Sequence, residues 1–171
     1  MINFESELLQ TGPLKIIRFP IDISEKLPSR GMVMVEGEID GEVFVGALEP
    51  DGKGSHWLEI SPLLIREKGI KVGDSLSLTI EPIGNWPKPD VPEEFINYII
   101  KENILEEWNS LTSKAQWDWV RWIRSTENKE TRNKRILVAC SKMKKGDRRP
   151  CCFDRTRSTV TSVSKSGVLL D

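Results

Sequence analysis

Apolar and polar residues alternate with a two-residue period through the first half of the chain. Between residues 75 and 80, Leu76, Leu78 and Ile80 alternate with three hydroxyl-bearing residues, so the two sets point to opposite faces of a strand. One apolar face per strand is typical of a sheet that covers a core on one side only. The same pattern predicts six short strands, at residues 2–9, 14–19, 32–39, 42–48, 56–60 and 74–81.

Turn and capping signals show how these strands are connected. Asp40-Gly41 tolerates the positive φ angles of a tight type I′ turn and predicts a hairpin. Ser61, Pro62 and Gly69 have the residue types of an N-cap, a first helical position and a left-handed C-terminal residue, which predicts a short helix between them. Because short strands with one apolar face must close or leave exposed edges, we expect a small β-barrel over residues 1–83.

Prolines dominate residues 82–92, and the pattern beyond them is helical. We expect a stiff linker at residues 84–92 and a helical region at 93–147. The predicted helices cover about 93–101, 103–111, 113–125 and 128–145, the second being separate or a bent continuation of the first. Ser113 and Gln116 have capping-box spacing. The fold class is therefore α+β, and the Ser/Thr-rich tail, 148–171, is either loose or an added strand.

The charge is unevenly distributed, although the whole chain has a formal net charge of −1. Residues 1–111 carry 20 acidic and 10 basic side chains, whereas residues 112–171 carry 6 and 15. Halves of opposite sign can simply attract each other, or the basic half can face an anionic partner. There is no apolar run long enough to span a membrane and no signal-peptide pattern at Met1, so we expect a cytoplasmic protein that does not use a membrane.

Three cysteines and one histidine limit the metal and redox chemistry that we expect. A zinc site would need Cys140, Cys151, Cys152 and His56 together, at a spacing unlike that of common sites. We therefore expect no metal, no cofactor, and reduced, partly buried thiols. Two arginines precede the Cys151-Cys152 pair and would lower the pKa of its thiols, which makes the pair a candidate redox site. The alternative is that Cys151 and Cys152 have no redox role and are two small side chains that pack the tail against the rest of the fold.

The order of parts resembles a known family. Trp119-Val120-Arg121-Trp122-Ile123 and the run from Glu130 to Ile136 resemble the YdeI/OmpD-associated family, also called bacteriocin-protection proteins. Gly37-Glu38-Ile39-Asp40-Gly41 and Gly73-Asp74-Ser75-Leu76 are similar to the domain of unknown function that often precedes it. This resemblance covers most of residues 1–147 and implies a double-split β-barrel followed by helices, with no established activity. Residues 62–80 also resemble the swapped hairpin of AbrB-like, DNA-binding regulators.

Trp117 is a candidate ligand contact on the predicted helix at 113–125. It falls nearly opposite the apolar face, with Arg121 and Arg124 four and seven residues later. An indole beside guanidinium groups could stack on a nucleic-acid base or bind an anionic surface. The alternative is that Trp117 packs on a neighbouring element and the arginines lie over it.

Four further residues are candidate ligand or anion contacts. Arg132 shares the apolar face of its helix with Ile136, so it must pair with a carboxylate or extend out of the core, and Arg135 lies close by. An ion pair to a neighbouring element and an anion site both fit this position. His56 and Trp57 stand at the start of a strand. The residues around His56 do not have the spacing of a Ser-His-Asp triad, a metal site or a phosphate-binding loop, so we expect no catalytic residue.

These observations predict a protein of unknown function that works as a non-enzymatic binding or stress-protection module. Its partner would be an anionic ligand or another protein. One alternative is a nucleic-acid binder that uses the basic C-terminal half. A second alternative is an enzyme with its site in a cleft between barrel and helices.

Overall fold

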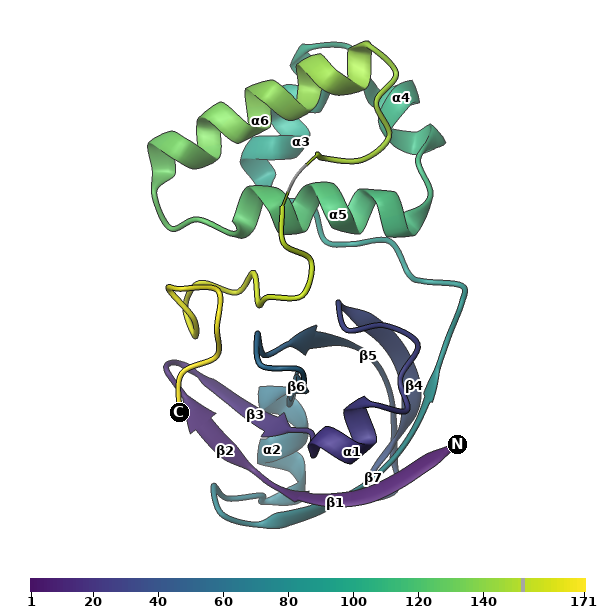
Figure 1. Ribbon diagram of the computed structural model, residues 1–171, viewed down its shortest axis with the longest axis vertical. Coiled ribbons are helices and arrows are strands. Elements are labelled where there is room, and N and C mark those ends of the chain that lie inside the picture. The colour runs from purple at the N-terminus through teal and green to yellow at the C-terminus, as the bar shows by residue number, and fades with distance from the viewer. Residues whose placement is uncertain (152) are drawn as a thin grey trace. The chain divides into compact units, whose positions relative to one another are not determined.

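The structure, a computed structural model, describes residues 1–151 and 153–171 and divides the chain into two units (Figure 1). The first unit contains residues 1–84 and 155–171, and the second contains residues 85–154. A curled antiparallel sheet comes first in the chain and helices follow it, which confirms the α+β prediction. Residues 155–171 fold with the strands even though they follow the helices in sequence.

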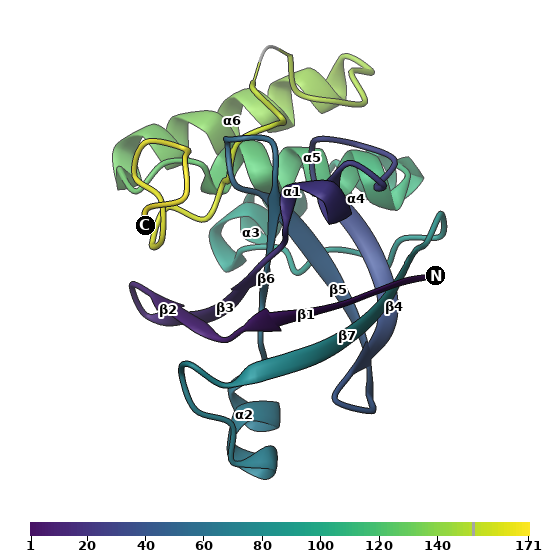
Figure 2. The ribbon, with the colours of Figure 1, turned by 60° about the horizontal axis from the view of Figure 1, so that its bottom comes forward.

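The first unit is built on a seven-stranded sheet that curls into a half-barrel (Figure 2). Its strand order is β1-β7-β4-β5-β6-β3-β2, and every neighbouring pair is antiparallel. The strands are β1 (Ile2–Glu7), β2 (Leu9–Thr11), β3 (Leu14–Arg18), β4 (Val33–Ile39), β5 (Glu42–Pro50), β6 (His56–Glu59) and β7 (Ser75–Pro82). The predicted first strand is thus divided in two at the buried Leu8, whose N–H donates to the Asp74 carbonyl (2.9 Å).

Two close approaches produce the curl of the sheet. The Ser6 hydroxyl on β1 donates to the Arg18 carbonyl on β3 (2.9 Å), so the first and third strands meet although they are distant in the strand order. Gly37 on β4 faces Ile80 on β7, and a Cβ at this position would lie 1.8 Å from the Thr79 carbonyl oxygen. Only glycine therefore lets β4 come this close to β7.

The alternating pattern of the sequence is realised in the core of the first unit. Leu76, Leu78 and Ile80 are at most 1% exposed, while Ser75 and Ser77 are exposed. Burying one such aliphatic side chain stabilises the fold by about 1.5–3 kcal/mol. The core unites side chains from most strands and from both short helices, α1 (Ile21–Ser24) and α2 (Pro62–Lys68).

The predicted turn, the N-cap position of Ser61 and the end of α2 are confirmed, but the expected capping bond of the Ser61 side chain is absent. Asp40 and Gly41 have φ angles of 48° and 84°, and Gly69 ends α2 with φ of 63°. Ser61 precedes the helix without a side-chain capping bond. Because Ser61, Pro62 and Leu63 are exposed, water can satisfy the first-turn amides, and the fold does not need the hydroxyl there.

The C-terminal residues 155–171 contain turns and irregular backbone and pack against the sheet. Val163 and Leu169 share a small core with Trp57 and Ile16, and the Leu169 N–H donates to the Asp51 carbonyl (2.9 Å). The carboxylate of Asp171 pairs with Arg18 and with Lys53. This part of the tail is therefore neither loose nor an added strand.

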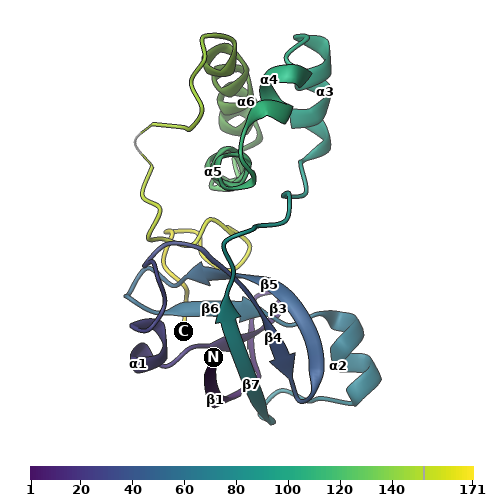
Figure 3. The ribbon, with the colours of Figure 1, turned by 90° about the vertical axis from the view of Figure 1, so that its right-hand side faces the viewer.

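The second unit contains four helices around one core (Figure 3). They are α3 (Glu93–Lys101), α4 (Leu105–Ser110), α5 (Ser113–Arg124) and α6 (Lys129–Lys144). The predicted capping box at Ser113 is wrong, because Thr112 is the cap and its hydroxyl accepts from the Ala115 N–H (3.1 Å). Gln116 instead donates to the Trp108 carbonyl (2.9 Å). No helix in the described part of the chain is long and apolar enough to cross a membrane.

Candidate functional site

His56 lies inside the first unit with only 1% of its surface exposed. Its backbone N–H donates to the Ser24 hydroxyl (3.1 Å), and its ring Nε2 lies 2.8 Å from the Gly31 carbonyl oxygen. Since a carbonyl only accepts, Nε2 carries the proton and Nδ1 does not. Burial lowers the pKa of His56, although the bond to Gly31 and the charge of Asp51 act in the opposite direction. The histidine is a neutral interior group out of reach of a ligand at the surface.

Trp57 also belongs to the interior. It is 2% exposed and packs with Ile16, Val163 and Leu169. Its contacts are therefore those that hold the C-terminal residues on the sheet. A stabilising role for this side chain follows from the contacts alone, because an indole of this size buries a large apolar area.

The candidate contacts on α5 do not gather on one surface. The Trp117 indole N–H donates to the Pro87 carbonyl in the segment before α3 (2.8 Å), and the Arg124 guanidinium lies 6.0 Å from its ring centre. Arg121 is 2% exposed, so it does not lie beside Trp117 at the surface. The helical wheel placed Arg121 opposite the apolar face, and a wheel drawn for one helix cannot show which of its residues the rest of the fold buries.

Arg132 and Arg135 bind the C-terminal end of α5. Arg135 Nη1 donates to the Trp122 carbonyl (2.7 Å) and to the Ser125 hydroxyl (2.6 Å), and its guanidinium lies 5.5 Å from the Trp122 ring centre. Arg132 Nη2 donates to the Thr126 carbonyl (3.1 Å). The last carbonyls of a helix lack intrahelical donors and carry partial negative charge. These arginines tie α6 to α5 through carbonyl oxygens instead of a carboxylate.

The cysteines provide one inert thiol and one pair that the structure describes only in part. Cys140 is 2% exposed, and burial raises the pKa of its thiol to about 11, which disfavours the reactive thiolate. Cys151 is exposed and disulfide-bonded, so it is not the reduced, partly buried thiol that we expected. Cys152 lies outside the described residues. Among the described residues, no three potential ligands cluster as a metal site.

Charge is distributed more evenly between the two structural units than between the two halves of the sequence. The first unit has 11 basic and 15 acidic side chains, and the second has 14 and 11. Their net charges are −4 and +3, far smaller than the contrast between the two halves of the sequence. The difference arises because the C-terminal residues, which include Arg155, Arg157 and Lys165, fold with the acidic strands. The basic half of the sequence is therefore not one basic domain.

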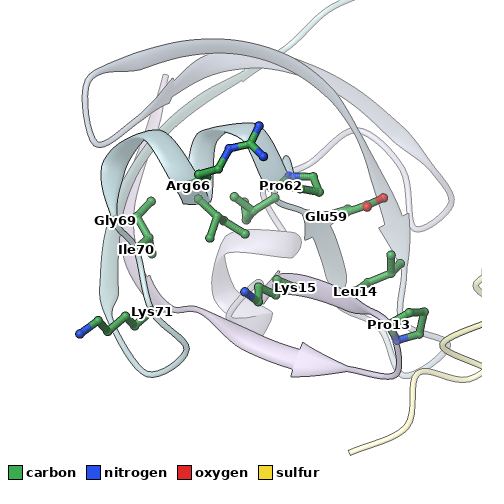
Figure 4. Close-up of a pocket in the computed structure, with 11 residues that line it drawn as sticks. Pro13, Leu14, Lys15, Glu59, Pro62, Arg66, Gly69, Ile70 and Lys71 are labelled. Atoms are coloured by element: carbon green, nitrogen blue, oxygen red, sulfur yellow. The ribbon is translucent and has the colours of Figure 1, made fainter.

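A groove in the first unit combines an apolar floor with basic side chains (Figure 4). It has a volume of about 590 Å³ and runs between α2, the start of β3 and the end of β6. Its apolar lining consists of Pro13, Leu14, Ile60, Pro62, Ile65 and Ile70. Three cations, Lys15, Arg66 and Lys71, face a single acid, Glu59. Figure 4 shows Lys71 and Glu59 at opposite ends and Lys15 between them.

Backbone hydrogen bonds fix the walls of this groove. The Ile60 N–H donates to the Lys15 carbonyl, which joins β6 to β3 at 2.9 Å. The Ile70 N–H donates to the Ile65 carbonyl (3.0 Å) after Gly69 has ended α2, and the Lys71 N–H donates to Asp74 Oδ2 (2.8 Å). The groove is therefore held open by the fold itself.

The basic side chains of the groove take part in none of the ion pairs formed between described residues. By contrast, Lys68 on the same helix pairs with Glu42 (2.7 Å), which raises the pKa of Lys68. Lys15 is half-buried, while Arg66 and Lys71 are exposed to water. The arrangement suits a ligand with an anionic group and an apolar body, because both parts meet a complementary surface.

The sequence carried only a weak signal for the groove. Ile60, Ile65 and Ile70 recur at intervals of five residues, and apolar residues of this kind predict a hydrophobic core. Ile65 and Ile70 are indeed mostly buried, at 8% and 9% exposed. Lys15 is separated from them by more than forty residues of sequence. Only the pairing of β3 with β6 places it beside α2.

Comparison with known families gives two matches in tandem. Residues 4–80 match the model of a domain of unknown function, DUF1905. Residues 88–146 match the model described as Bacteriocin-protection, YdeI or OmpD-Associated. No curated protein matches the chain. The boundary between the two matches lies close to the boundary between the two structural units, near residue 84.

Proposed function

Since residues 88–146 match the model of the YdeI/OmpD-associated, bacteriocin-protection family and residues 4–80 match the DUF1905 model, we propose a function for the groove in that preceding domain. In this proposal the protein is a non-enzymatic binding module. The groove beside α2 holds an anionic molecule that has an apolar body. The cytoplasm, expected from the sequence, is the proposed location.

The observation that carries the proposal is the set of three groove cations that pair with no acid among the described residues. Lys15, Arg66 and Lys71 surround an apolar floor, whereas Lys68, one residue before the C-cap of the same helix, is already paired. A carboxylate or phosphate group in the groove would gain charge-assisted hydrogen bonds. Its apolar body would cover Leu14, Ile60 and neighbouring side chains.

Binding, and not catalysis, is the activity that this site supports. Its charged lining offers two lysines, one arginine and one glutamate, and it contains no serine, cysteine or histidine to act as a nucleophile with a base. The family description names protection from bacteriocins. We propose that ligand binding is the step through which any such protection would act.

The proposal is tested by calorimetric titration of the full chain with decanoate, below its micellar concentration. Decyl maltoside is the neutral comparison, since its alkyl chain is only about one carbon longer than that of decanoate and it carries no charge. We expect decanoate to bind and decyl maltoside to bind at least about tenfold more weakly, because exposed ion pairs contribute about 0.2–1 kcal/mol each. Equal affinities would contradict an anion site.

A triple variant, Lys15→Gln/Arg66→Gln/Lys71→Gln, locates the site. We expect about a tenfold loss of decanoate affinity with an unchanged melting temperature, because these cations pair with no acid in the fold. The matched control, Lys26→Gln/Arg30→Gln/Lys165→Gln, removes the same charge from exposed positions outside the groove. An equal loss in both triple variants would show general attraction to a charged surface, and not a groove.

A further inference from the structure

The outer face of β1, β4, β5 and β7 contains no basic residue. None of these four strands includes a lysine or an arginine. The side chains that leave the core along them are acidic, hydroxyl-bearing, amide or apolar. This face therefore has the opposite sign to the groove beside α2, although both belong to the same unit.

The strand register places an apolar column next to an acidic one. On β4, Glu36 stands between Val45 of β5 and Glu81 of β7. Two residues further along β4, Glu38 stands between Val43 and Thr79. Side chains two residues apart on a strand point to the same face, so Val43 and Val45 form a short apolar row beside Glu36 and Glu38.

The apolar row is exposed and borders a hollow in the sheet surface. Val43 is 81% exposed and Val45 is 55% exposed. Together with Glu36, Glu38 and Glu81 they line a hollow of about 470 Å³. Residues of the hollow and of the groove beside α2 do not overlap, so the two surfaces are independent sites.

The acidic residues of this face repel one another in the free protein. Glu36 and Glu81 are directly opposite across β4 and β7, where like charges destabilise a sheet. None of the ion pairs between described residues includes Glu36, Glu38 or Glu81. A cation placed over them would relieve the repulsion, so this face is complementary to a positively charged partner.

We propose that the outer face formed by Val43, Val45, Glu36, Glu38 and Glu81 binds a cationic amphipathic peptide segment. Basic side chains of the segment pair with the three glutamates. Its apolar side chains cover the two valines and exclude water from them. Nucleic acids and anionic lipid surfaces are repelled by the same glutamates. A second copy of this chain that presented the same face would also be repelled, because a two-fold interface would bring the glutamates together.

Fluorescence anisotropy with a labelled 14-residue peptide of leucine and lysine tests this proposal on the full chain. The comparison peptides carry glutamate in place of lysine, or serine in place of leucine. We expect the leucine–lysine peptide to bind and the serine–lysine peptide to bind at least about tenfold more weakly. The leucine–glutamate peptide is compared on the variant Lys15→Gln/Arg66→Gln/Lys71→Gln, which lacks the groove cations, and we expect it not to bind there. Equal binding of the serine–lysine peptide would overturn the proposal, because attraction would then be purely a matter of charge.

The variant Glu36→Gln/Glu81→Gln separates a binding role from a structural one. We expect about tenfold weaker peptide binding together with an unchanged or higher melting temperature, because the substitution removes a repulsion. The matched control, Glu25→Gln/Glu67→Gln, neutralises two exposed glutamates of the same unit outside this face. Unchanged peptide affinity in Glu36→Gln/Glu81→Gln, or an equal loss in the control, would overturn the proposal.

A second variant, Val43→Thr/Val45→Thr, tests the apolar row while keeping β-branched side chains that suit a strand. We expect weaker binding of the leucine–lysine peptide and no change for the serine–lysine peptide. If both peptides lose affinity equally, the valines do not contact the apolar side chains and the proposal fails.

Discussion

Basic side chains have different surroundings in the two units. In the helical unit, Arg132 and Arg135 donate to backbone carbonyls at the end of α5. In the first unit, Lys15, Arg66 and Lys71 line a groove and take part in no ion pair among the described residues. The comparison teaches that the number of basic residues in a region does not measure its capacity to bind anions.

The physical reason for the difference lies in the backbone. A helix end leaves carbonyls without intrahelical donors, and a nearby guanidinium is a strong donor for them. The groove beside α2 is bounded by a sheet whose amides and carbonyls already pair with each other, and by a helix end closed by Gly69 and Ile70 amides. Its cations therefore remain available to a ligand.

The largest effect that sharpens this comparison is expected from Arg135→Ala. Hydrogen bonds from a charged donor contribute about 1.5–3 kcal/mol, so we expect the helical unit to lose about 2–3 kcal/mol of unfolding free energy. Five of the six tryptophans belong to this unit, so urea unfolding followed by tryptophan fluorescence reports mainly on it.

The control variant is Lys134→Ala, which changes the exposed neighbour of Arg135 on α6. We expect it to change the unfolding free energy by less than about 0.5 kcal/mol. A loss in Arg135→Ala no greater than in Lys134→Ala would remove the contrast between the units. Arg135 would then be as available to an anion as the groove cations are.

Acid should affect the first unit more than the helical unit. His56, the only histidine, has a pKa lowered by burial, so below about pH 6.5 the unfolded state takes up a proton more readily than the folded state. The stability that depends on neutral His56 is therefore present above that pH and is lost as the pH falls. Urea titrations at pH 7.5 and 5.5, followed by the NMR signals of β3 and β6 amides, should show a lower midpoint at pH 5.5.

Two controls test whether His56 causes the expected pH effect, namely the midpoint of the helical unit and the variant His56→Gln. Lys144 lowers the pKa of Glu102, so the stability from this carboxylate is lost only below the ordinary glutamate value of 4.5, outside the range measured. The tryptophan-detected midpoint should thus shift less than that of the first unit. In His56→Gln the shift of the first unit should shrink, and a shift of the same size there would assign the acid sensitivity to other groups.

The smallest effect is expected in the binding of nucleic acid by the full chain. With a net charge of +3 in the helical unit and two of its arginines bound to carbonyls, we expect the full chain to bind short DNA and RNA more weakly than about 1 μM at 150 mM salt. Anisotropy titrations at 50 and 200 mM salt check this. Submicromolar affinity that falls about a thousandfold between these salts would instead indicate six or more phosphate contacts and favour nucleic acid.

Local pattern was sufficient to predict most elements of both units. Alternation places Leu76, Leu78 and Ile80 in the core, and Asp40-Gly41 makes its turn because few other residue pairs tolerate positive φ angles. Gly69 ends α2 for the same reason. The cap at Ser113 was predicted wrongly, since two hydroxyl-bearing residues stand near that helix start and the backbone selects Thr112. Ser61 takes its predicted N-cap position, but its side chain makes no capping bond.

The sequence by itself thus determined the α+β order and the faces of the strands, because both depend on residues near one another in the chain. Only the tertiary structure decided the rest. The strand pairings bring Lys15 to α2 and set Glu36 opposite Glu81, and the fold returns Leu169 to Trp57. These contacts join residues far apart in sequence, and their energies depend on register and burial, which no local pattern encodes.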